Sequence, residues 1–361
     1  MDTEIRIGLV GCGGIANGLY LPGIADIPRA EVVALCDISP ERLEATSQRW
    51  SVFQTYTDLG EMLAQSDIDL LINTTPIQAH YKLNLQAVEA GVNVYTEKSM
   101  TITVEEADRL IEAARANGVL LASAPDMMVR PGVSRLRELV ASQAVGPVVW
   151  AQVRSSHGGP DSFPTRRDPS WFYQPGAGPI LDMGVYGLHL ITGLLGPARR
   201  VTAFSARSRP LRRVRRGPLK GLEVKVEIDD NVLILLDFSD SVLAFVDSGY
   251  CVPGSRTPQM ELFGTDGTLS FNGYSADPPF EIFMDDMERG VRGWITPDGK
   301  LPQPETRAMG VAHVVDCLLN QEELILTPEH ARHVIEIMNK AQESARQGKA
   351  LELETAFPWT S

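Results

Sequence analysis

The sequence predicts an α/β protein with two domains, a doubly wound parallel sheet followed by an α+β domain with a large, open, mostly antiparallel sheet. Three observations support this fold class. The chain has 361 residues, which is more than a single hydrophobic core usually spans. Residues 5–123 alternate short apolar runs with helix-period segments, the pattern of βαβ units. After residue 125, strand-like runs follow one another directly, which favours antiparallel pairing.

The first domain is expected to span residues 1–125. Its predicted strands are the short apolar runs at 5–10, 32–37, 54–55, 70–73, 93–96 and 119–123. The segment 104–117 has a clear helical period, with apolar residues at 107, 110, 111 and 114 on one face, and Gly118 follows as a stop signal. We therefore predict a crossover helix here that covers the sheet.

The second domain is expected to span residues 126–361. A helix is predicted at 133–142, and strands are predicted at 148–155, 224–228, 232–238, 242–248, 261–263 and 268–271. Helical periodicity returns at 309–319 and at 328–347, where Gly348 is the expected end. One arrangement left open is that the C-terminal helix packs back on the first domain.

Composition limits the functions that the chain can have. Hydrophobic residues make up 43% and charged residues 22%, as in ordinary globular proteins. The formal net charge of −13 argues against a nucleic acid partner, which needs basic side chains facing phosphates. The four cysteines lack metal-ligand or disulfide spacing, so no metal is expected. With neither a signal peptide nor an apolar run near the ~20 residues of a membrane span, we expect a cytoplasmic protein without a membrane partner.

One basic run departs from this acidic balance. Pro210 interrupts it and Gly217-Pro218 ends it, so a solvated connection between strands is the simplest interpretation. A site for an anionic substrate group and a subunit contact are the alternatives. The run consists of Arg207, Arg209, Arg212, Arg213, Arg215 and Arg216.

A glycine-rich motif lies between the first predicted strand and a predicted helix. Gly11 permits a tight turn, Gly13 lets a pyrophosphate approach the backbone, and Ala16 allows close packing of the helix on the sheet. Free N–H groups at the start of the helix face the phosphates. We therefore expect a dinucleotide on the segment Gly11, Cys12, Gly13, Gly14, Ile15 and Ala16.

The residue after the second strand indicates which dinucleotide binds. Asp37 ends this strand, where an acidic side chain accepts hydrogen bonds from the adenosine ribose. Its charge would repel a 2′-phosphate, which favours NAD. Arg42 is close in sequence and keeps NADP as the alternative. The first domain is thus predicted to be a Rossmann domain that binds NAD.

Three further segments carry polar side chains at places suited to a ligand. Thr75 and Pro76, with His80 beyond them, follow the fourth strand, and Glu97-Lys98 follow the fifth, at the edge where open α/β sheets bind ligands. A third segment in the second domain runs from Asp182 through Tyr186 to His189 after a glycine-rich stretch.

Taken together, these landmarks resemble the Gfo/Idh/MocA family of oxidoreductases over nearly the full length of the chain. The resemblance implies a soluble NAD(P)-dependent enzyme that transfers a hydride between nicotinamide and a secondary hydroxyl of a sugar, glycoside or polyol. It also implies that the substrate sits between the second domain and the nicotinamide. The open sheet of the second domain commonly mediates dimers or tetramers in the family, so a homo-oligomer is expected.

The resemblance implies that Lys98 is the catalytic lysine, which handles the proton of the reacting oxygen, and that Glu97 positions it. An ammonium in a partly buried cleft can have its pKa lowered toward neutrality, which suits such proton exchange. A surface lysine after a strand is the alternative. The family usually has Pro after this pair, whereas this chain has Ser99, which puts the geometry of the loop in question.

The second departure lies in the segment 182–189. Asp182 is retained, Tyr186 stands where the family usually has His, and His189 stands in place of the final Asp. Members that resemble glucose-fructose oxidoreductase also have Tyr at that place, and a phenol can relay a proton. On a helix, positions i, i+4 and i+7 share one face, so all three side chains can face one cleft. For His189 a hydrogen-bonded core histidine is an equal alternative.

His157 and Trp171, on a predicted loop, are further candidate substrate contacts, although aromatic residues there are more often packing residues. Arg166 and Arg167 could meet cofactor phosphate or substrate. Two other functions remain open beside the dehydrogenase. One is an enzyme that recycles NAD through a keto intermediate during epimerisation or glycoside cleavage. The other is a non-catalytic protein that responds to NAD.

Overall fold

The chain folds into two units. The computed structural model describes residues 4–164, 167–239, 242–273, 276–286, 290–297 and 307–359. The N-terminal unit takes in residues 1–131 and 303–335, and the C-terminal unit takes in 132–302 and 336–361. The described residues 307–335 are therefore grouped with the N-terminal unit. The sequence analysis placed all residues after 125 in the second domain and left open that the C-terminal helix packs on the first. The boundary expected after residue 125 stays a prediction.

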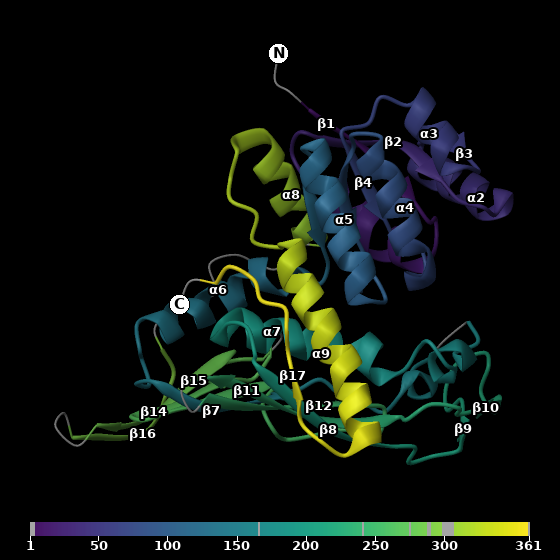
Figure 1. Ribbon diagram of the computed structural model, residues 1–361. Coiled ribbons are helices and arrows are strands. Elements are labelled where there is room, and N and C mark those ends of the chain that lie inside the picture. Colours follow the sequence, from purple (N-terminus) through teal and green to yellow (C-terminus); the bar gives the residue numbers. More distant parts are fainter. Residues whose placement is uncertain are drawn as a thin grey trace. The chain divides into compact units, whose positions relative to one another are not determined.

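The N-terminal unit is built on a six-stranded parallel sheet in the order β3-β2-β1-β4-β5-β6 (Figure 1). The order reverses between β1 and β4, and this switch point is where open α/β sheets bind ligands. The strands are β1 (Ile5–Val10), β2 (Ala30–Cys36), β3 (Gln54–Tyr56), β4 (Leu70–Asn73), β5 (Asn93–Thr96) and β6 (Leu121–Ser123).

Helices connect these strands, and α4 and α5 lie side by side (Figure 1). Ser39, Asp58 and Thr103 cap the helices that follow them through side-chain oxygens, as short polar residues do at helix starts. The helices of this unit are η1 (Ala16–Tyr20), α1 (Leu21–Ile24), α2 (Pro40–Trp50), α3 (Leu59–Gln65), α4 (Ile77–Glu89), α5 (Val104–Asn117), η2 (Asp126–Val129) and α8 (Met309–Asn320). Helix α9 (Pro328–Gln347) continues from this unit into the next.

The C-terminal unit contains a nine-stranded sheet in the order β16-β15-β14-β13-β7-β12-β11-β8-β17. Neighbouring strands are antiparallel except β7 and β12, which are parallel. The strands are β7 (Val148–Arg154), β8 (Arg200–Ala206), β11 (Asn231–Ser239), β12 (Val242–Gly249), β13 (Met260–Gly264), β14 (Gly267–Phe271), β15 (Phe280–Asp286), β16 (Val291–Ile295) and β17 (Leu351–Glu352). A separate hairpin pairs β9 (Leu211–Arg213) with β10 (Glu223–Lys225).

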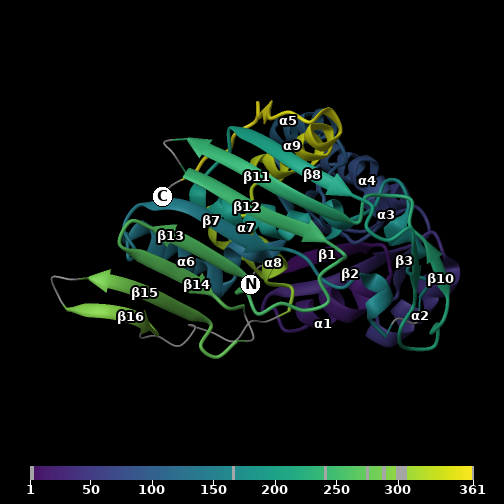
Figure 2. The same cartoon turned by 90° about the horizontal axis from the view of Figure 1, so that it is seen from below.

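Helices cover one face of this large sheet. Figure 1 shows α6 (Pro131–Ala141) and α7 (Val185–Leu195) on that face, and Figure 2 views the strands from the opposite side. The shorter helical turns of the unit are η3 (Pro160–Ser162), η4 (Ser170–Tyr173) and η5 (Ile180–Gly184). Helix α7 is hydrophobic and buried along nearly its whole length. It therefore fixes the position of η5, the turn that precedes it.

The fold class predicted from the sequence is confirmed. The helix predicted at 104–117 is α5, and Gly118 ends it with φ +66°, the left-handed conformation that glycine adopts easily. The sequence missed β8, β9, β15, β16 and β17, and the strand predicted at 224–228 is the shorter β10 of the hairpin. Within the described residues, none of the helices combines the length and hydrophobicity that a membrane span requires.

Candidate functional site

The turn after β1 has room only for glycine at its first position. Gly11 has φ +95°, and a Cβ there would lie 2.8 Å from the backbone carbon of Thr74 and from the backbone nitrogen of Thr75. Backbone atoms cannot move aside as the end of a flexible side chain can, so a larger residue would force apart the ends of β1 and β4. The tight turn predicted for Gly11 is therefore present.

The next residues of the motif leave one side of the loop open. A Cβ on Gly13 would meet no described atom within 4 Å, and Gly14 is exposed. Ile15 is 43% exposed although it is apolar, whereas Ala16 is fully buried against the sheet. An open glycine backbone beside an exposed apolar side chain is what a dinucleotide needs for its pyrophosphate and rings. The loop therefore fits an NAD-type cofactor.

Asp37 follows β2 and binds to the glycine turn. Its carboxylate accepts hydrogen bonds from the backbone N–H groups of Cys12 and Ser39, both at 2.8 Å. Arg42 forms an ion pair with it at 2.8 Å. Burial alone would raise the pKa of Asp37, but the hydrogen bonds from Arg42, Ser39 and Cys12 lower it below its ordinary value. Asp37 is therefore an ionised acceptor at the position where the ribose hydroxyls are expected.

The loop after β4 is tied to the loop after β5 through a histidine. The imidazole of His80 is buried, with Nε2 2.8 Å from the carbonyl oxygen of Thr75 and Nδ1 2.7 Å from that of Ser99. Burial lowers the pKa of His80. Pro76 is exposed and precedes the first turn of α4. His80 thus links the two loops to each other, and its buried side chain has almost no exposed surface to offer a ligand.

Glu97 and Lys98 come directly after β5 at the same edge of the sheet. The Glu97 carboxylate accepts hydrogen bonds from the hydroxyl of Tyr20 at 2.7 Å and from the backbone N–H of Lys98 at 3.0 Å. Tyr20 belongs to η1, the turn that follows the glycine motif. Glu97 therefore fixes the backbone of Lys98 against the cofactor loop. The side chain of Lys98 is partly buried, and its peptide bond to Ser99 is cis.

In the C-terminal unit, Asp182, Tyr186 and His189 lie on one continuous helical segment. Asp182 is in the π-helical turn η5, and the other two are in α7. Asp182 and Tyr186 are partly buried, while His189 is 5% exposed and its Nδ1 donates to the carbonyl oxygen of Val185 at 2.8 Å. This is the environment of the core histidine that the sequence left open, and a catalytic role for His189 stays a prediction.

A tyrosine that the sequence analysis missed joins two of the predicted residues. Tyr250 follows β12, and its hydroxyl donates to the Asp182 carboxylate at 3.0 Å. The His157 ring stacks on the Tyr250 ring with centroids 5.3 Å apart. Burial, reinforced by the charge of Asp182, raises the pKa of Tyr250. The phenol is therefore a permanent donor to Asp182. The only available sequence signal was its place directly after a strand.

His157 is held in a defined orientation. Its Nδ1 accepts a hydrogen bond from the backbone N–H of Gly159 at 2.8 Å, which leaves the proton of a neutral ring on Nε2. Burial lowers the pKa of His157, Asp182 raises it, and Arg212 lowers it further. Burial and Arg212 outweigh Asp182, which favours a neutral ring. Trp171 is 58% exposed and stacks on Phe172 with ring centroids 3.8 Å apart, and its role as a substrate contact stays a prediction.

The interpretation of the basic run as a solvated connection is wrong for one residue, Arg212, whereas the other five arginines of the run are exposed. Arg212 lies in β9 with a fully buried side chain, 3.0 Å from the Asp161 carboxylate and 2.7 Å from that of Asp230. It also donates to the carbonyl oxygens of Tyr250 at 2.9 Å and Gly158 at 3.2 Å. Burial opposes its charge, but the hydrogen bonds to the carboxylates raise the pKa of Arg212. Arg166, a further candidate, lies outside the described residues.

The predicted residues thus form two sets. In the N-terminal unit the glycine motif, Asp37, the loop at Thr75 and Glu97-Lys98 all lie at the carboxyl ends of the strands. In the C-terminal unit Tyr250, which the sequence analysis missed, contacts both Asp182 and His157. In the part of the chain that the structure describes, no cluster of three or more His, Cys, Asp or Glu residues could hold a metal ion.

Comparisons with known families match both units. Residues 5–124 match the oxidoreductase family with an NAD-binding Rossmann fold, and residues 133–270 match the GFO/IDH/MocA C-terminal domain. The chain belongs to the Gfo/Idh/MocA oxidoreductase family. This membership confirms the family resemblance seen in the sequence, and with it an oxidoreductase whose N-terminal unit binds NAD.

Individual relatives cover almost the whole chain. D-apiose dehydrogenase of Paraburkholderia graminis is 25% identical over 96% of this chain and 89% of its own length. The scyllo-inositol 2-dehydrogenase (NAD(+)) of Bacillus subtilis is 22% identical over 100% and 99%, respectively. Among solved structures, a levoglucosan dehydrogenase in complex with NADH and L-sorbose has a TM-score of 0.83 at 17% identity, over 98% of this chain and 100% of the other. That structural likeness shows a shared fold.

Proposed function

We propose that this family member is a dehydrogenase that oxidises a secondary hydroxyl of a sugar, glycoside or polyol and reduces NAD. The observation that carries the proposal is the Glu97–Lys98 pair. Glu97 fixes the backbone of Lys98 at the sheet edge where the glycine motif lies, through Tyr20 of the turn that follows the motif. A dinucleotide-binding protein without catalysis has no need of a partly buried lysine in that place. Relatives named as D-apiose and scyllo-inositol dehydrogenases support the substrate class.

Each residue then has a defined task. NAD, when bound, supplies the hydride acceptor. Lys98 takes the proton of the reacting hydroxyl in oxidation and returns it in reduction, as a positioned general base and acid. Asp182, held by the Tyr250 hydroxyl, accepts hydrogen bonds from substrate hydroxyls, and Tyr186 donates to a substrate oxygen. His157, with its proton on Nε2, offers a further donor.

The test is a screen for NADH formation by absorbance across pentoses, hexoses, glycosides and inositols, with NAD and NADP in parallel. We expect one class of polyhydroxylated substrate to give steady NADH formation. We also expect NAD to be preferred, because an ionised Asp37 repels a 2′-phosphate. Product without accumulating NADH would point to an enzyme that recycles NAD. No turnover with any compound, together with tight NAD binding, would favour a regulatory protein and contradict the proposal.

We propose further that the uncovered face of the large sheet pairs with a second copy of the chain. Apolar side chains on alternate positions of neighbouring strands point to this face, where Leu233 is paired with Phe204 and Leu243 with Trp150. They are exposed by 41%, 74%, 55% and 40%, in that order. Contiguous apolar surface of this kind is rare on monomers. Figure 2 shows the strands that carry these residues, β7, β12, β11 and β8, side by side in the extended sheet.

Sedimentation velocity tests this assembly. We expect the wild-type chain to sediment as a dimer or tetramer and Leu233→Lys/Leu243→Lys to sediment as a monomer, because burying lysine charges at the interface opposes association. Gln342→Lys, at an exposed position of α9, is the control and should leave the assembly intact. A monomeric wild-type chain at micromolar concentration would contradict the proposal.

A further inference from the structure

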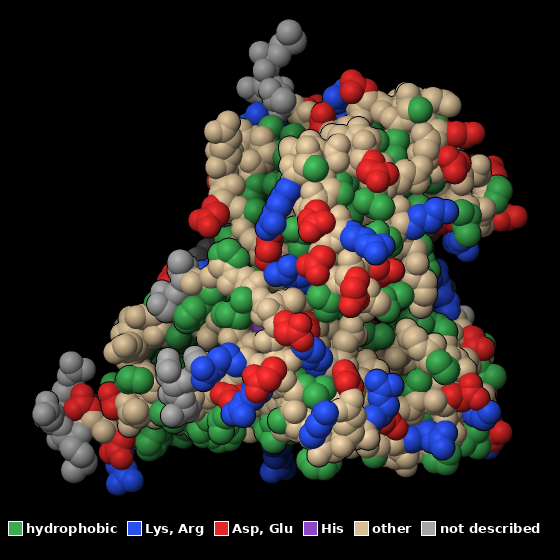
Figure 3. All heavy atoms as spheres, viewed as in Figure 1, with side chains coloured by type: hydrophobic (Ala, Val, Ile, Leu, Met, Phe, Trp, Pro, Cys, Tyr) green, Lys and Arg blue, Asp and Glu red, His purple; other side chains and the backbone are tan. Residues whose placement is uncertain are grey.

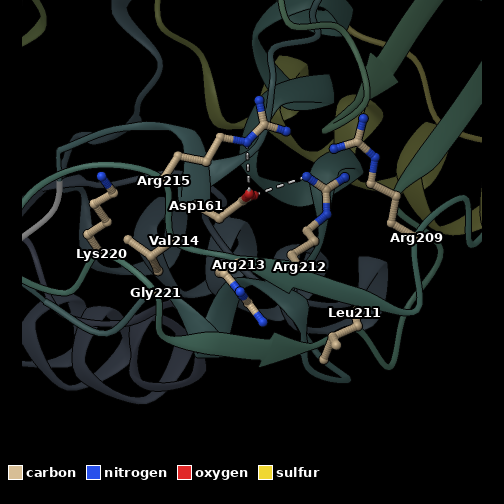
Figure 4. A pocket seen from close by; sticks show the side chains of 9 residues that line it. All are labelled: Asp161, Arg209, Leu211, Arg212, Arg213, Val214, Arg215, Lys220 and Gly221. Carbon is tan, nitrogen blue, oxygen red and sulfur yellow. Dashed lines mark hydrogen bonds and ion pairs between the residues drawn. The ribbon is translucent and has the colours of Figure 1, made fainter.

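The β9–β10 hairpin forms a pocket that the proposed reaction does not use. Arg212 anchors the hairpin to Asp161, and the backbone N–H of Arg215 donates to the Asp161 carbonyl oxygen at 3.0 Å. Underneath, a small apolar core that includes Tyr173 and Val224 keeps the hairpin folded. The pocket has a volume of about 670 Å³ and is lined by Asp161, Arg209, Leu211, Arg212, Arg213, Val214, Arg215, Lys220 and Gly221 (Figure 4).

The lining carries an excess of positive charge. Asp161 is its only carboxylate among the described residues, and Arg212 and the Tyr173 hydroxyl already bind that carboxylate, at 3.0 Å and 2.5 Å. Within the described chain, neither Arg209 nor Lys220 has a carboxylate within ion-pair distance. The lining therefore holds five cationic side chains and a single carboxylate that is already neutralised, and one of the five, Arg213, pairs with Glu223 instead.

The geometry of β9 determines which of these cationic side chains face the pocket. Successive side chains of a strand point to opposite sides, so Arg212 extends to one side of β9 while Leu211 and Arg213 extend to the other. Figure 4 shows Arg209, Arg212 and Arg215 extending to the same side of the hairpin. Arg215 lies 3.9 Å from Asp161, a long ion pair that leaves most of its donors available. On the face in Figure 3, by contrast, basic and acidic side chains are mixed.

We propose that this pocket binds a phosphate group, held mainly by Arg209 and Arg215, whose guanidinium groups extend to the same side of the hairpin, while Lys220 adds positive charge at the other end of the lining (Figure 4). Arginine presents a fork of donors that matches phosphate oxygens, and lysine adds a point charge. The buried Arg212–Asp161 ion pair holds the β9–β10 hairpin in a fixed geometry, so the charged side chains extend from a rigid element. In a chain with a net charge of −13, this local concentration of cations selects an anion against the overall field. The ligand is either free phosphate or the phosphate group of a sugar phosphate.

Isothermal titration calorimetry with inorganic phosphate tests the site directly. The protein is first saturated with NAD, so that the glycine motif is already filled and cannot take up the added phosphate. We expect wild-type protein to bind phosphate, and Arg209→Gln/Lys220→Gln to bind it at least about tenfold more weakly, since hydrogen bonds to charged groups are lost. Both side chains are exposed, so the variant should fold normally. Arg256→Gln/Lys349→Gln makes the same charge change at exposed positions outside the pocket and should bind like the wild type.

Titration with glucose 6-phosphate and with glucose identifies the source of the phosphate. Tighter binding of the sugar phosphate than of inorganic phosphate, lost in Arg209→Gln/Lys220→Gln, assigns the pocket to a sugar phosphate, and equal binding assigns it to free phosphate. Equal phosphate affinity in the wild type and this variant would overturn the proposal. So would an equal loss in the control variant, or no binding at millimolar phosphate. Because inorganic phosphate has no hydroxyl-bearing carbon to oxidise, its titration involves no turnover, and that result is independent of whether the chain is a sugar dehydrogenase.

Discussion

Lys98→Ala is expected to abolish nearly all hydride transfer while leaving NAD bound. General acid–base catalysis by one positioned group contributes about 10²–10⁴-fold, and we expect kcat to fall within that range. The glycine motif and Asp37 remain unchanged, so the dissociation constant for NAD should shift only a few-fold. Steady-state kinetics on the substrate found by screening, combined with NAD titration by fluorescence, separates these two effects.

Two companion variants distinguish proton exchange from charge alone. Lys98→Arg keeps the positive charge, but a guanidinium does not give up its proton, so it should be nearly as inactive as Lys98→Ala. Lys82→Ala removes an exposed lysine of α4 and should behave like the wild type. A Lys98→Ala enzyme that turns over at the wild-type rate would remove Lys98 from the mechanism.

The cofactor half of the site was predictable because its signals are local. Gly11, Gly13 and Ala16 lie within six residues, and the strand before them, β1, is an apolar run whose bounds match the prediction residue for residue. Strand β4 is equally clear, because its four residues are all buried and Thr74-Thr75-Pro76 follow at once. Buried parallel strands read as continuous apolar runs, so pattern alone places their ends.

The substrate half was only partly predictable because its contacts are long-range. Tyr250 is 68 residues from Asp182, to which it donates, and nothing near either residue predicts the pair. Strand β8 escaped detection because it consists mostly of small and polar residues, and its one aromatic side chain, Phe204, is 74% exposed. The basic run was misinterpreted for a related reason. Composition records how many arginines are present, but the partners of Arg212 are 51 and 18 residues away.

Arg212→Met is expected to destabilise the C-terminal unit strongly, because the substitution removes a fully buried cation. The substitution keeps much of the side-chain volume but leaves the carboxylates of Asp161 and Asp230, 1% and 0% exposed, without their main counter-charge. Breaking a buried ion pair in this way costs about 3–5 kcal/mol. Urea unfolding followed by tryptophan fluorescence measures the loss, because Trp150, Trp171, Trp294 and Trp359 all belong to this unit.

The neighbouring arginine is the matched control. Arg213 is exposed and, among the described residues, forms its ion pair with exposed Glu223 across the hairpin, so Arg213→Met should cost at most about 1 kcal/mol. The double variant Arg212→Met/Asp230→Asn removes one of the carboxylates that Arg212→Met leaves without a partner. Its free energy of unfolding should therefore be higher than that of Arg212→Met alone, a coupling that independent sites do not show. If Arg212→Met and Arg213→Met were equally stable, the buried ion pairs could not be holding the hairpin.

The same variant links stability to the proposed site. Arg212 donates to the carbonyl oxygens of Tyr250 and Gly158, so it fixes the backbone on both sides of the stacked His157 and Tyr250 rings. In conditions where Arg212→Met is still folded, Tyr250 should orient Asp182 less well, and KM for the sugar should rise more than kcat falls. NAD affinity should not change, because the glycine motif lies in the other unit. If NAD affinity fell by the same factor by which KM rose, the variant would be generally unfolded, and Arg212 would have no positioning role.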